Sequence, residues 1–295
     1  MLEQSILKGC CDIHLHVAPS LIPRSADIVT VAREAERAGY RAIVIKDHHY
    51  NSAPACQQIQ KYLFPDSHLK IFGSIALNNS VGGVNPYVVQ AAIGFGAKII
   101  WMPTVSAAQH MEYHKTSGAF PSASIALSDI PITLLNENGA LKDQVTDVIR
   151  IVAAHPDVVL ATGHGHAKEV NAVVEKAVRL GVKKIVVDHP TFGIGATLEQ
   201  VKYWASLGCW IEHCGTISDP RMGEKGTPVE EIVHYIQEVG VEHCILSSDY
   251  GQEKFGNCIQ GMDTYLHALR QNGLSEEELR RMACTNPARL LDLSE

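Results

Sequence analysis

Two histidines near the start of the chain, His14 and His16, are spaced so that they can bind a metal together. They end a short apolar run at residues 10–16. Side chains along a β-strand alternate between its two faces, so residues two apart point to the same side. Two neutral imidazoles on one face form half of a site for a divalent transition metal. The motif alone is weak evidence for metal binding.

Histidines and acidic residues recur at the ends of later apolar runs. They are His48 and His49, His164 and His166, Asp188 and His189, Glu212 and His213, and Asp249. For any one of these histidines, a hydrogen-bonded structural role is the commoner explanation. Chance placement does not explain why so many apolar runs end in this way. Together these residues predict a metal-dependent enzyme.

The runs that carry these residues predict an α/β fold, a (β/α)₈ TIM barrel. Short β-branched runs alternate with amphipathic stretches, which is the pattern of parallel strands joined by helices. In such a barrel the active site forms at the carboxyl ends of the strands, which is where the polar residues fall. The strands are expected at residues 10–16, 41–46, 69–77, 98–102, 157–162, 183–188, 209–213 and 243–248.

Two helices between these strands have clear signals, and the whole chain, residues 1–295, is read as a single domain. A helix is expected at 26–38, where Gly39 is a stop signal. A second is expected at 197–207, where the residues from Thr197 to Gln200 suit a capping box. The apolar stripe of the first helix consists of Ile28, Val31, Ala32 and Ala35.

The connection after the fourth strand is longer than the others and is read as an insertion at about residues 103–141. An Asn-Gly turn at Asn138 and Gly139 lies between apolar arms and predicts a small hairpin. A long loop on the catalytic face is a candidate lid. A homo-oligomer, with this loop packed against another subunit, is also compatible with the sequence.

The composition narrows the classes of function. Of the 295 residues 46% are hydrophobic and 19% charged, which fits a sizeable core and excludes a mainly disordered chain. No apolar run approaches the roughly 20 residues of a membrane span, and no signal-peptide pattern begins the chain, so we expect a cytoplasmic protein without a membrane partner. The 25 basic residues are scattered among 32 acidic ones, which argues against nucleic acid and favours a small-molecule substrate. The eight cysteines are expected to be reduced core residues.

The first-strand pattern Asp12-x-His14-x-His16, the histidines after strands five and six, the last-strand Ser-Asp and the closing residues 286–291 resemble the amidohydrolase superfamily of metal-dependent hydrolases. The resemblance covers most of the chain and is closest to a poorly characterised subgroup. It implies that the first-strand histidines bind one metal and that the histidines after strands five and six bind a second. The aspartate after strand eight then binds metal and handles the proton of the attacking water. These roles fall on His14, His16, His164, His189 and, as the catalytic residue, Asp249.

One departure from the superfamily concerns the lysine that bridges two metals as a carbamate in many of its members. That lysine belongs to strand four, but Lys98 lies at the amino-terminal end of the fourth strand here. Lys46 ends strand two, so we propose a carbamylated Lys46 as the bridge. The alternative is an ion pair of Lys46 with Asp47 or Asp12. A mononuclear site of His14, His16, His164 and Asp249 then remains.

Other polar residues near the strand ends are candidate substrate contacts. His48 and His49 are adjacent, as are Glu212 and His213, and only one residue of each pair is expected to face the barrel axis. Glu212 also suits a carboxylate that fixes the tautomer of a ligand histidine. Arg24 suits a clamp for a substrate carboxylate, with an ion pair to Asp27 as the alternative. The candidates are Arg24, His48, His49, His110, Glu212 and His213, with His114 beside His110.

These residues favour a hydrolase in which one or two divalent metals activate water. Histidine ligands favour zinc, with manganese or iron as alternatives. Hydrolysis of a C–N bond in a small amide or cyclic amide ranks first, ahead of a related ester or lactone. Two other classes stay open. A metal-dependent decarboxylase or other lyase would use the same ligands, and a metal-free aldolase would use Lys46 as a Schiff-base nucleophile.

Overall fold

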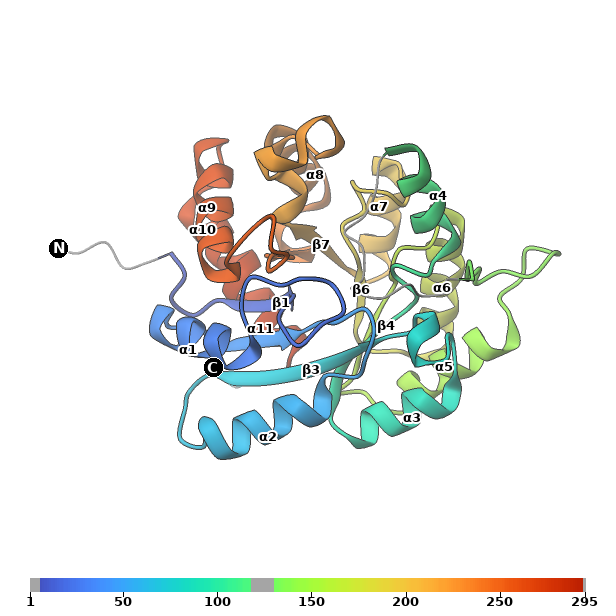
Figure 1. Ribbon diagram of the computed structural model, residues 1–295. Coiled ribbons are helices and arrows are strands. Elements are labelled where there is room, and N and C mark those ends of the chain that lie inside the picture. The colour runs from blue at the N-terminus through green and yellow to red at the C-terminus, as the bar shows by residue number, and fades with distance from the viewer. Residues whose placement is uncertain (1–5, 118–129, 294–295) are drawn as a thin grey trace.

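The computed structural model describes residues 6–117 and 130–293 and shows eight parallel strands surrounded by helices (Figure 1). The strands pair in chain order, and the Asp249 N–H at the end of the last donates to the carbonyl of His14 on the first, at 2.7 Å. The strands are β1 (Cys11–Leu15), β2 (Ala42–Ile45), β3 (Lys70–Ala76), β4 (Ala97–Trp101), β5 (Val159–Ala161), β6 (Ile185–Val187), β7 (Trp210–Cys214) and β8 (Cys244–Ser247). Each predicted strand overlaps an observed one, and the predicted (β/α)₈ barrel is confirmed.

The helices lie outside the strands and cover the barrel. The main ones are α1 (Ile28–Ala38), α2 (Ala53–Leu63), α3 (Pro86–Gly94), α4 (Ala108–Ser117), α5 (Asp143–Ala153), α6 (Ala167–Leu180), α7 (Leu198–Ser206), α8 (Val229–Val239) and α9 (Cys258–Gln271). The C-terminal part adds α10 (Glu276–Arg280), a π-helical turn (Arg281–Thr285) and α11 (Asn286–Leu290). Short 3₁₀ turns lie at Asn79–Val81, Thr216–Ser218, Pro220–Lys225 and Val241–His243.

Both helices with sequence signals form as predicted. Asp27 caps α1 by accepting from the Thr30 N–H, and Gly39 ends it in the left-handed region at φ 81°. The predicted stripe of α1 is buried in full. In α7, Thr197 and Gln200 form the reciprocal hydrogen bonds of a capping box.

The inside of the barrel is apolar below the level of the site. Alternate strand residues point inward and pack together, while the residues between them pack against the helices. The inward set includes Cys11, Ile13, Ala42, Val44, Ile99, Trp101, Val159, Ala161, Val186 and Ile245. On β2 the inward series runs from Ala42 through Val44, so Lys46 is the next residue to point inward. The polar side chains at the carboxyl ends therefore rest on a packed floor.

The insertion after β4 begins with α4. A parallel bridge joins Ala107 to Ile132, and an antiparallel bridge joins Leu135 to Leu141 across the turn that contains Asn138 and Gly139. Part of the predicted lid, residues 118–129, lies outside the described residues. The described helix α4 carries His110, whose ring packs against that of His164 after β5.

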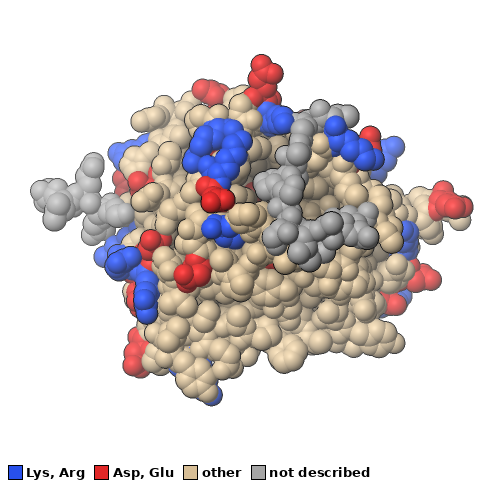
Figure 2. Space-filling view, viewed as in Figure 1, with Lys and Arg blue, Asp and Glu red and all other residues tan. Residues whose placement is uncertain are grey.

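The structure also shows how the surface charges are distributed and what state the cysteines are in. Figure 2 shows basic and acidic residues interspersed on the viewed face. None of the helices described is long and apolar enough to span a membrane. All eight cysteines are buried free thiols.

Candidate metal centre

His14, His16 and Asp249 meet at the mouth of the barrel. Asp249 Oδ1 lies 3.1 Å from His14 Nε2 and 3.0 Å from His16 Nε2. The register of β1 shifts between Asp12 and Leu15, so this part of the strand departs from simple alternation. The three side chains offer one ligand atom each, and these atoms lie within 4.8 Å of one another. This is the spacing of ligands around a single cation.

The hydrogen bonds of His16 fix which of its nitrogens has a lone pair. Nδ1 donates to the backbone carbonyl of Lys46 at 3.0 Å, and a carbonyl can only accept. Burial lowers the pKa of His16 to about 3, so the ring is neutral and Nε2 carries no proton. Nε2 therefore turns a lone pair toward the Asp249 carboxylate, and a cation between them would satisfy both.

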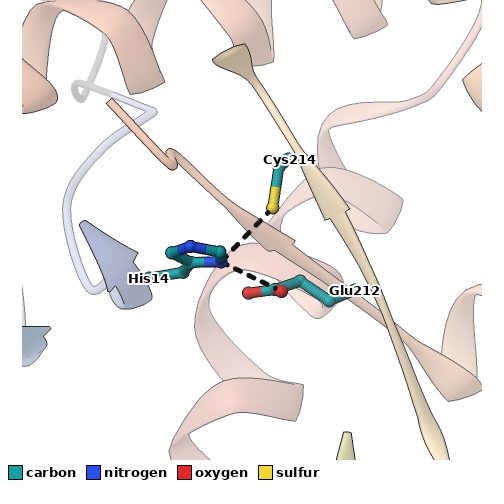
Figure 3. A group of neighbouring side chains, drawn as sticks. All are labelled: His14, Glu212 and Cys214. Carbon is teal, nitrogen blue, oxygen red and sulfur yellow. Dashed lines mark hydrogen bonds and ion pairs between the residues drawn. The ribbon is translucent and has the colours of Figure 1, made fainter. Parts of the chain in front are cut away.

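Nδ1 of His14 is likewise held by a hydrogen-bond partner, here a side chain from β7 (Figure 3). Its Nδ1 lies 3.1 Å from Glu212 Oε2 and 3.6 Å from the Cys214 sulfur. Glu212 and Cys214 are two residues apart on β7 and point to the same side. A buried carboxylate at Nδ1 keeps a proton on that nitrogen, so a metal that displaced the proton of Nε2 would bind there.

The charge around His14 favours a cation. Burial and the Lys46 ammonium lower the pKa of His14, but the carboxylates of Asp249 and Glu212 outweigh them and raise it to about 9. The pKa of Asp249 would be raised by burial, yet His14 and His16 hold it well below its ordinary value. The site is thus negative at the position where these two histidines converge.

Lys46 lies beside His14 and over the Trp101 ring. Its Nζ is 2.9 Å from His14 Nε2 and 4.1 Å from the centre of the Trp101 ring, and the side chain is fully buried. Among the described residues it pairs with neither Asp12 nor Asp47, so that alternative is wrong. Lys98 pairs with Asp292 at the other end of the barrel, at 3.2 Å.

A second group of histidines lies beside the first. The ring centres of His164 and His189 are 4.9 Å apart, and that of His189 is 6.1 Å from that of His14. His164 Nδ1 lies 3.0 Å from Nδ1 of His110, which comes from α4. His166, in contrast, caps α6 by accepting from the Lys168 N–H and takes no part in the group.

Buried polar atoms without hydrogen-bond partners gather in this second group. Within residues 6–117 and 130–293, they include His164 Nε2, His189 Nδ1, Asp188 Oδ1 and Glu212 Oε1. Burial lowers the pKa of His189 to about 4 and that of His164 well below its ordinary value, so both rings are neutral. Buried polar atoms normally have partners, and neutral imidazoles with a carboxylate are donors that zinc accepts. The residues present therefore fit one or two divalent metals.

His48 lies at the edge of the cluster and is held from β3 and β4. Its Nδ1 lies 2.9 Å from the Thr104 hydroxyl, and its ring centre is 4.8 Å from that of His16. Asn78 donates to the His48 carbonyl and to the same hydroxyl. His49 contacts Asp47 instead: its backbone N–H donates to Asp47 Oδ1 at 2.7 Å, and its Nδ1 lies 3.6 Å from the same oxygen.

Two sequence expectations need correction. His213 does not reach the cluster, because Glu212 and Cys214 point inward and the residue between them on β7 points outward; it is buried on the helix side. Arg24 does not pair with Asp27, whose carboxylate caps α1. Its nearest acidic partner is Asp47, with 3.9 Å between Nη2 and Oδ2.

Cys214 and Trp101 contact the candidate ligands but were not predicted as part of the site. Cys214 was read as core, although its position two residues after Glu212 would have placed it on the same side of β7. Trp101 is an apolar residue next to the polar strand end, and only the packing shows that it lies under the Lys46 ammonium.

A small cavity opens beside the second group of histidines. Its walls come from α4 and from the segment after β6, and they are mainly aromatic. It is lined by His110, Tyr113, His114, His164, His189, Phe192 and Gly193. The insertion thus supplies one wall of the space next to the candidate metal ligands.

Comparison with known proteins gives a family and a fold. Residues 9–212 match the model described as "Family of unknown function (DUF6282)". No curated protein matches.

Solved structures with a similar fold include an amidohydrolase from Pseudomonas aeruginosa, with 10% identity, 97% of each chain covered and a TM-score of 0.65. An organophosphorus hydrolase variant from Deinococcus radiodurans has 14% identity, 99% and 97% coverage and a TM-score of 0.58. A TatD homologue from Escherichia coli has 15% identity, 97% and 98% coverage and a TM-score of 0.54. The resemblance to the amidohydrolase superfamily is confirmed at the level of the fold.

Proposed function

We propose that this chain, which belongs to the DUF6282 family, is a metal-dependent hydrolase. The observation that carries the proposal is the convergence of His14 Nε2 and His16 Nε2 on one oxygen of Asp249, at 3.1 and 3.0 Å. Two imidazole nitrogens and a carboxylate that converge in a buried site need a positive charge among them. Without metal the raised pKa of His14 lets its ring supply a proton, and a divalent cation would take the place of that proton. Eight-stranded barrels of this kind place their active sites at this end.

The first metal would be held by His14, His16 and Asp249, and a second by His164 and His189. When bound, such a cation supplies Lewis acidity that makes water nucleophilic at neutral pH and polarises a scissile carbonyl. Glu212 holds the proton of His14 on Nδ1. Asp249, which is ionised, would accept the proton of the attacking water and pass it to the leaving group.

Lys46 is the proposed bridge between the two metals. Carbon dioxide would add to its neutral amine with loss of one proton and give an anionic carbamate. The support for this assignment is position, because Nζ lies 2.9 Å from a ligand nitrogen of His14 and is fully buried. An anion there would replace the ammonium that now faces His14.

We rank a C–N bond of a small amide or cyclic amide first as the bond that is broken. One structural neighbour is named as an amidohydrolase, and another as an organophosphorus hydrolase, so a related ester or lactone is second. Zinc is the favoured metal because most ligands are imidazoles, with manganese or iron next. We propose a cytoplasmic enzyme with a small-molecule substrate and no membrane or nucleic-acid partner, as the scattered charges support.

The test is metal content by elemental mass spectrometry on protein purified without added metal or chelator. The wild type is expected to hold one or two divalent ions per chain. His14→Ala should lose at least one of them, and the matched control His267→Ala, a half-exposed histidine of α9, should lose none. Two ions would support the binuclear site, and one would favour the mononuclear site.

Protein without metal, and with none recovered on titration, would overturn the proposal. Borohydride trapping of Lys46 with aldehydes or ketones would then test the Schiff-base alternative. For metal-loaded protein, turnover of an amide library in ¹⁸O-labelled water should place one labelled oxygen in the acid product. A product without the label would indicate a lyase.

A further inference from the structure

Arg24 is a buried arginine next to the candidate metal centre. It lies in the loop after β1, and the backbone of this loop pairs with the segment after β8. The Ser25 N–H donates to the Gly251 carbonyl at 2.9 Å, and an isolated antiparallel β-bridge joins the backbones of Arg24 and Gln252. Only 1% of its side chain is exposed. Its charge acts on His16 and on Asp249. The fold thus holds a cation within electrostatic reach of the two residues at the mouth.

The hydrogen-bonding edge of this guanidinium is unused. Within the part of the chain that the structure describes, Arg24 Nε and Nη2 are buried and have no hydrogen-bond partner. Together these two nitrogens form the side-on edge of an arginine, which donates two parallel N–H bonds to the two oxygens of a carboxylate. Leaving such donors unmade in a buried site is costly.

Asp47 does not fill this role. Its Oδ2 is 3.9 Å from Arg24 Nη2, which is beyond hydrogen-bond distance, while its Oδ1 accepts the His49 N–H at 2.7 Å. The hydroxyl of Tyr50, which interacts electrostatically with both Arg24 and Asp47, is also buried without a partner among the residues described. Asp47 Oδ2 is itself buried without a hydrogen-bond partner among the residues described, so it offsets the charge of Arg24 without accepting its hydrogen bonds. Arg24 and Tyr50, on different loops, thus offer donors that the carboxylate of a ligand could accept from.

We propose that Arg24 binds a carboxylate of the substrate side-on, with Tyr50 as a further donor. This deepens the proposed function and rests on it: the hydrolysed amide carries a carboxylate a few bonds from the scissile carbonyl. Asp47 already offsets one unit of positive charge, so a singly charged carboxylate suits this position better than a doubly charged phosphate. The substrate class is a small amide of an amino acid or a cyclic amide with a carboxylate substituent.

The test compares small N-acyl amino acids, beginning with N-acetylglycine, with their neutral amides, such as N-acetylglycinamide. Binding to the protein as purified is measured by calorimetry, and inorganic phosphate is a third probe. We expect the acids to bind better than the amides and phosphate. Arg24→Gln should weaken binding of the acids by about 100-fold, as expected for the loss of a buried charged pair, and leave binding of the amides unchanged.

Controls separate this effect from loss of fold or metal. Arg33→Gln removes an exposed arginine of α1 and should change nothing. Arg24→Lys keeps the positive charge but lacks the two parallel N–H donors of the guanidinium, so it should recover only part of the affinity for the acids. The double variant Arg24→Gln with Asp47→Asn removes both charges, so it keeps the test valid if Arg24→Gln alone unfolds. Metal content is measured on every sample.

The outcomes distinguish the two proposals. Acids that bind equally well to wild type and Arg24→Gln would overturn the role of Arg24, as would a wild type that prefers no acid to its amide. Preference for phosphate over the acids would also overturn the carboxylate assignment. Protein that prefers acids through Arg24 but holds no metal would instead overturn the hydrolase proposal and leave the carboxylate site standing.

Discussion

Glu212→Gln is expected to weaken metal binding about 10- to 30-fold without abolishing it. The Glu212 carboxylate is fully buried, and its Oε2 lies 3.1 Å from Nδ1 of His14. A hydrogen bond to a charged partner contributes roughly 1.5–3 kcal/mol and a neutral one roughly 0.5–1.5 kcal/mol. The difference of about 1–2 kcal/mol corresponds to a factor of about 5–30. Losses of about 10- to 100-fold are typical when a carboxylate behind a ligand histidine is changed.

The assay is a competitive titration of zinc between the protein and a chromogenic chelator. Glu199→Gln is the matched control, because this glutamate on α7 is exposed and its nearest cation is Lys202, at 4.0 Å. Unchanged affinity in Glu212→Gln would refute the argument that Glu212 fixes the tautomer of His14. Complete loss of one metal would refute it in the other direction, since Glu212 would then be a direct ligand together with Cys214.

Three further predictions address the bridge, the base and the fold. Lys46→Ala should reduce the metal content from two ions to one, while Lys98→Ala at the other end of the barrel should not, as elemental analysis would show. Asp249→Asn should slow hydrolysis of any amide the wild type cleaves by about 10²- to 10⁴-fold in kcat, and a rate within a few-fold of wild type would exclude Asp249 as the base. Asp27→Ala should lower stability by about 1 kcal/mol and Tm by about 2–4 °C. The Thr30 N–H lowers the pKa of Asp27, so this contribution is present above the ordinary value of 3.8 and is lost as the pH falls through the lowered pKa; a Tm difference that persists at pH 2 would contradict it.

The sequence predicts the barrel well because each strand and helix carries local signals. Alternating β-branched runs, the Asp27 cap and the Thr197 capping box act over a few residues and are read directly. The same holds for the location of the site, since residues at the ends of parallel strands must meet at one end of a barrel. Contacts between those residues depend on register, which no local signal fixes.

The failures follow from this difference. His213 and Glu212 are adjacent, and one residue of register decides which of them reaches His14. Arg24 was compared with Asp27, a near neighbour in sequence, but the Asp27 carboxylate is used by α1 and the nearest acid in space is Asp47 from the next strand. His110 was a candidate from the sequence, but because it lies in the insertion only the packing of α4 shows that it contacts His164.

The geometry at His14 makes Lys46 the residue that decides how the site is loaded. His14 Nδ1 faces Glu212, and Nε2 faces both Asp249 and the Lys46 nitrogen, so a metal bound at Nε2 would lie beside Lys46. A positively charged Lys46 at 2.9 Å from Nε2 would repel a cation bound there, whereas a carbamate would attract one. Removing Lys46 therefore has opposite effects on metal binding in the two cases, carbamate and ammonium. If the chain uses the carbamate, Lys46→Ala loses the second metal and added bicarbonate does not restore it. If the ammonium persists, the same substitution strengthens binding of the first metal and leaves the number of metals unchanged.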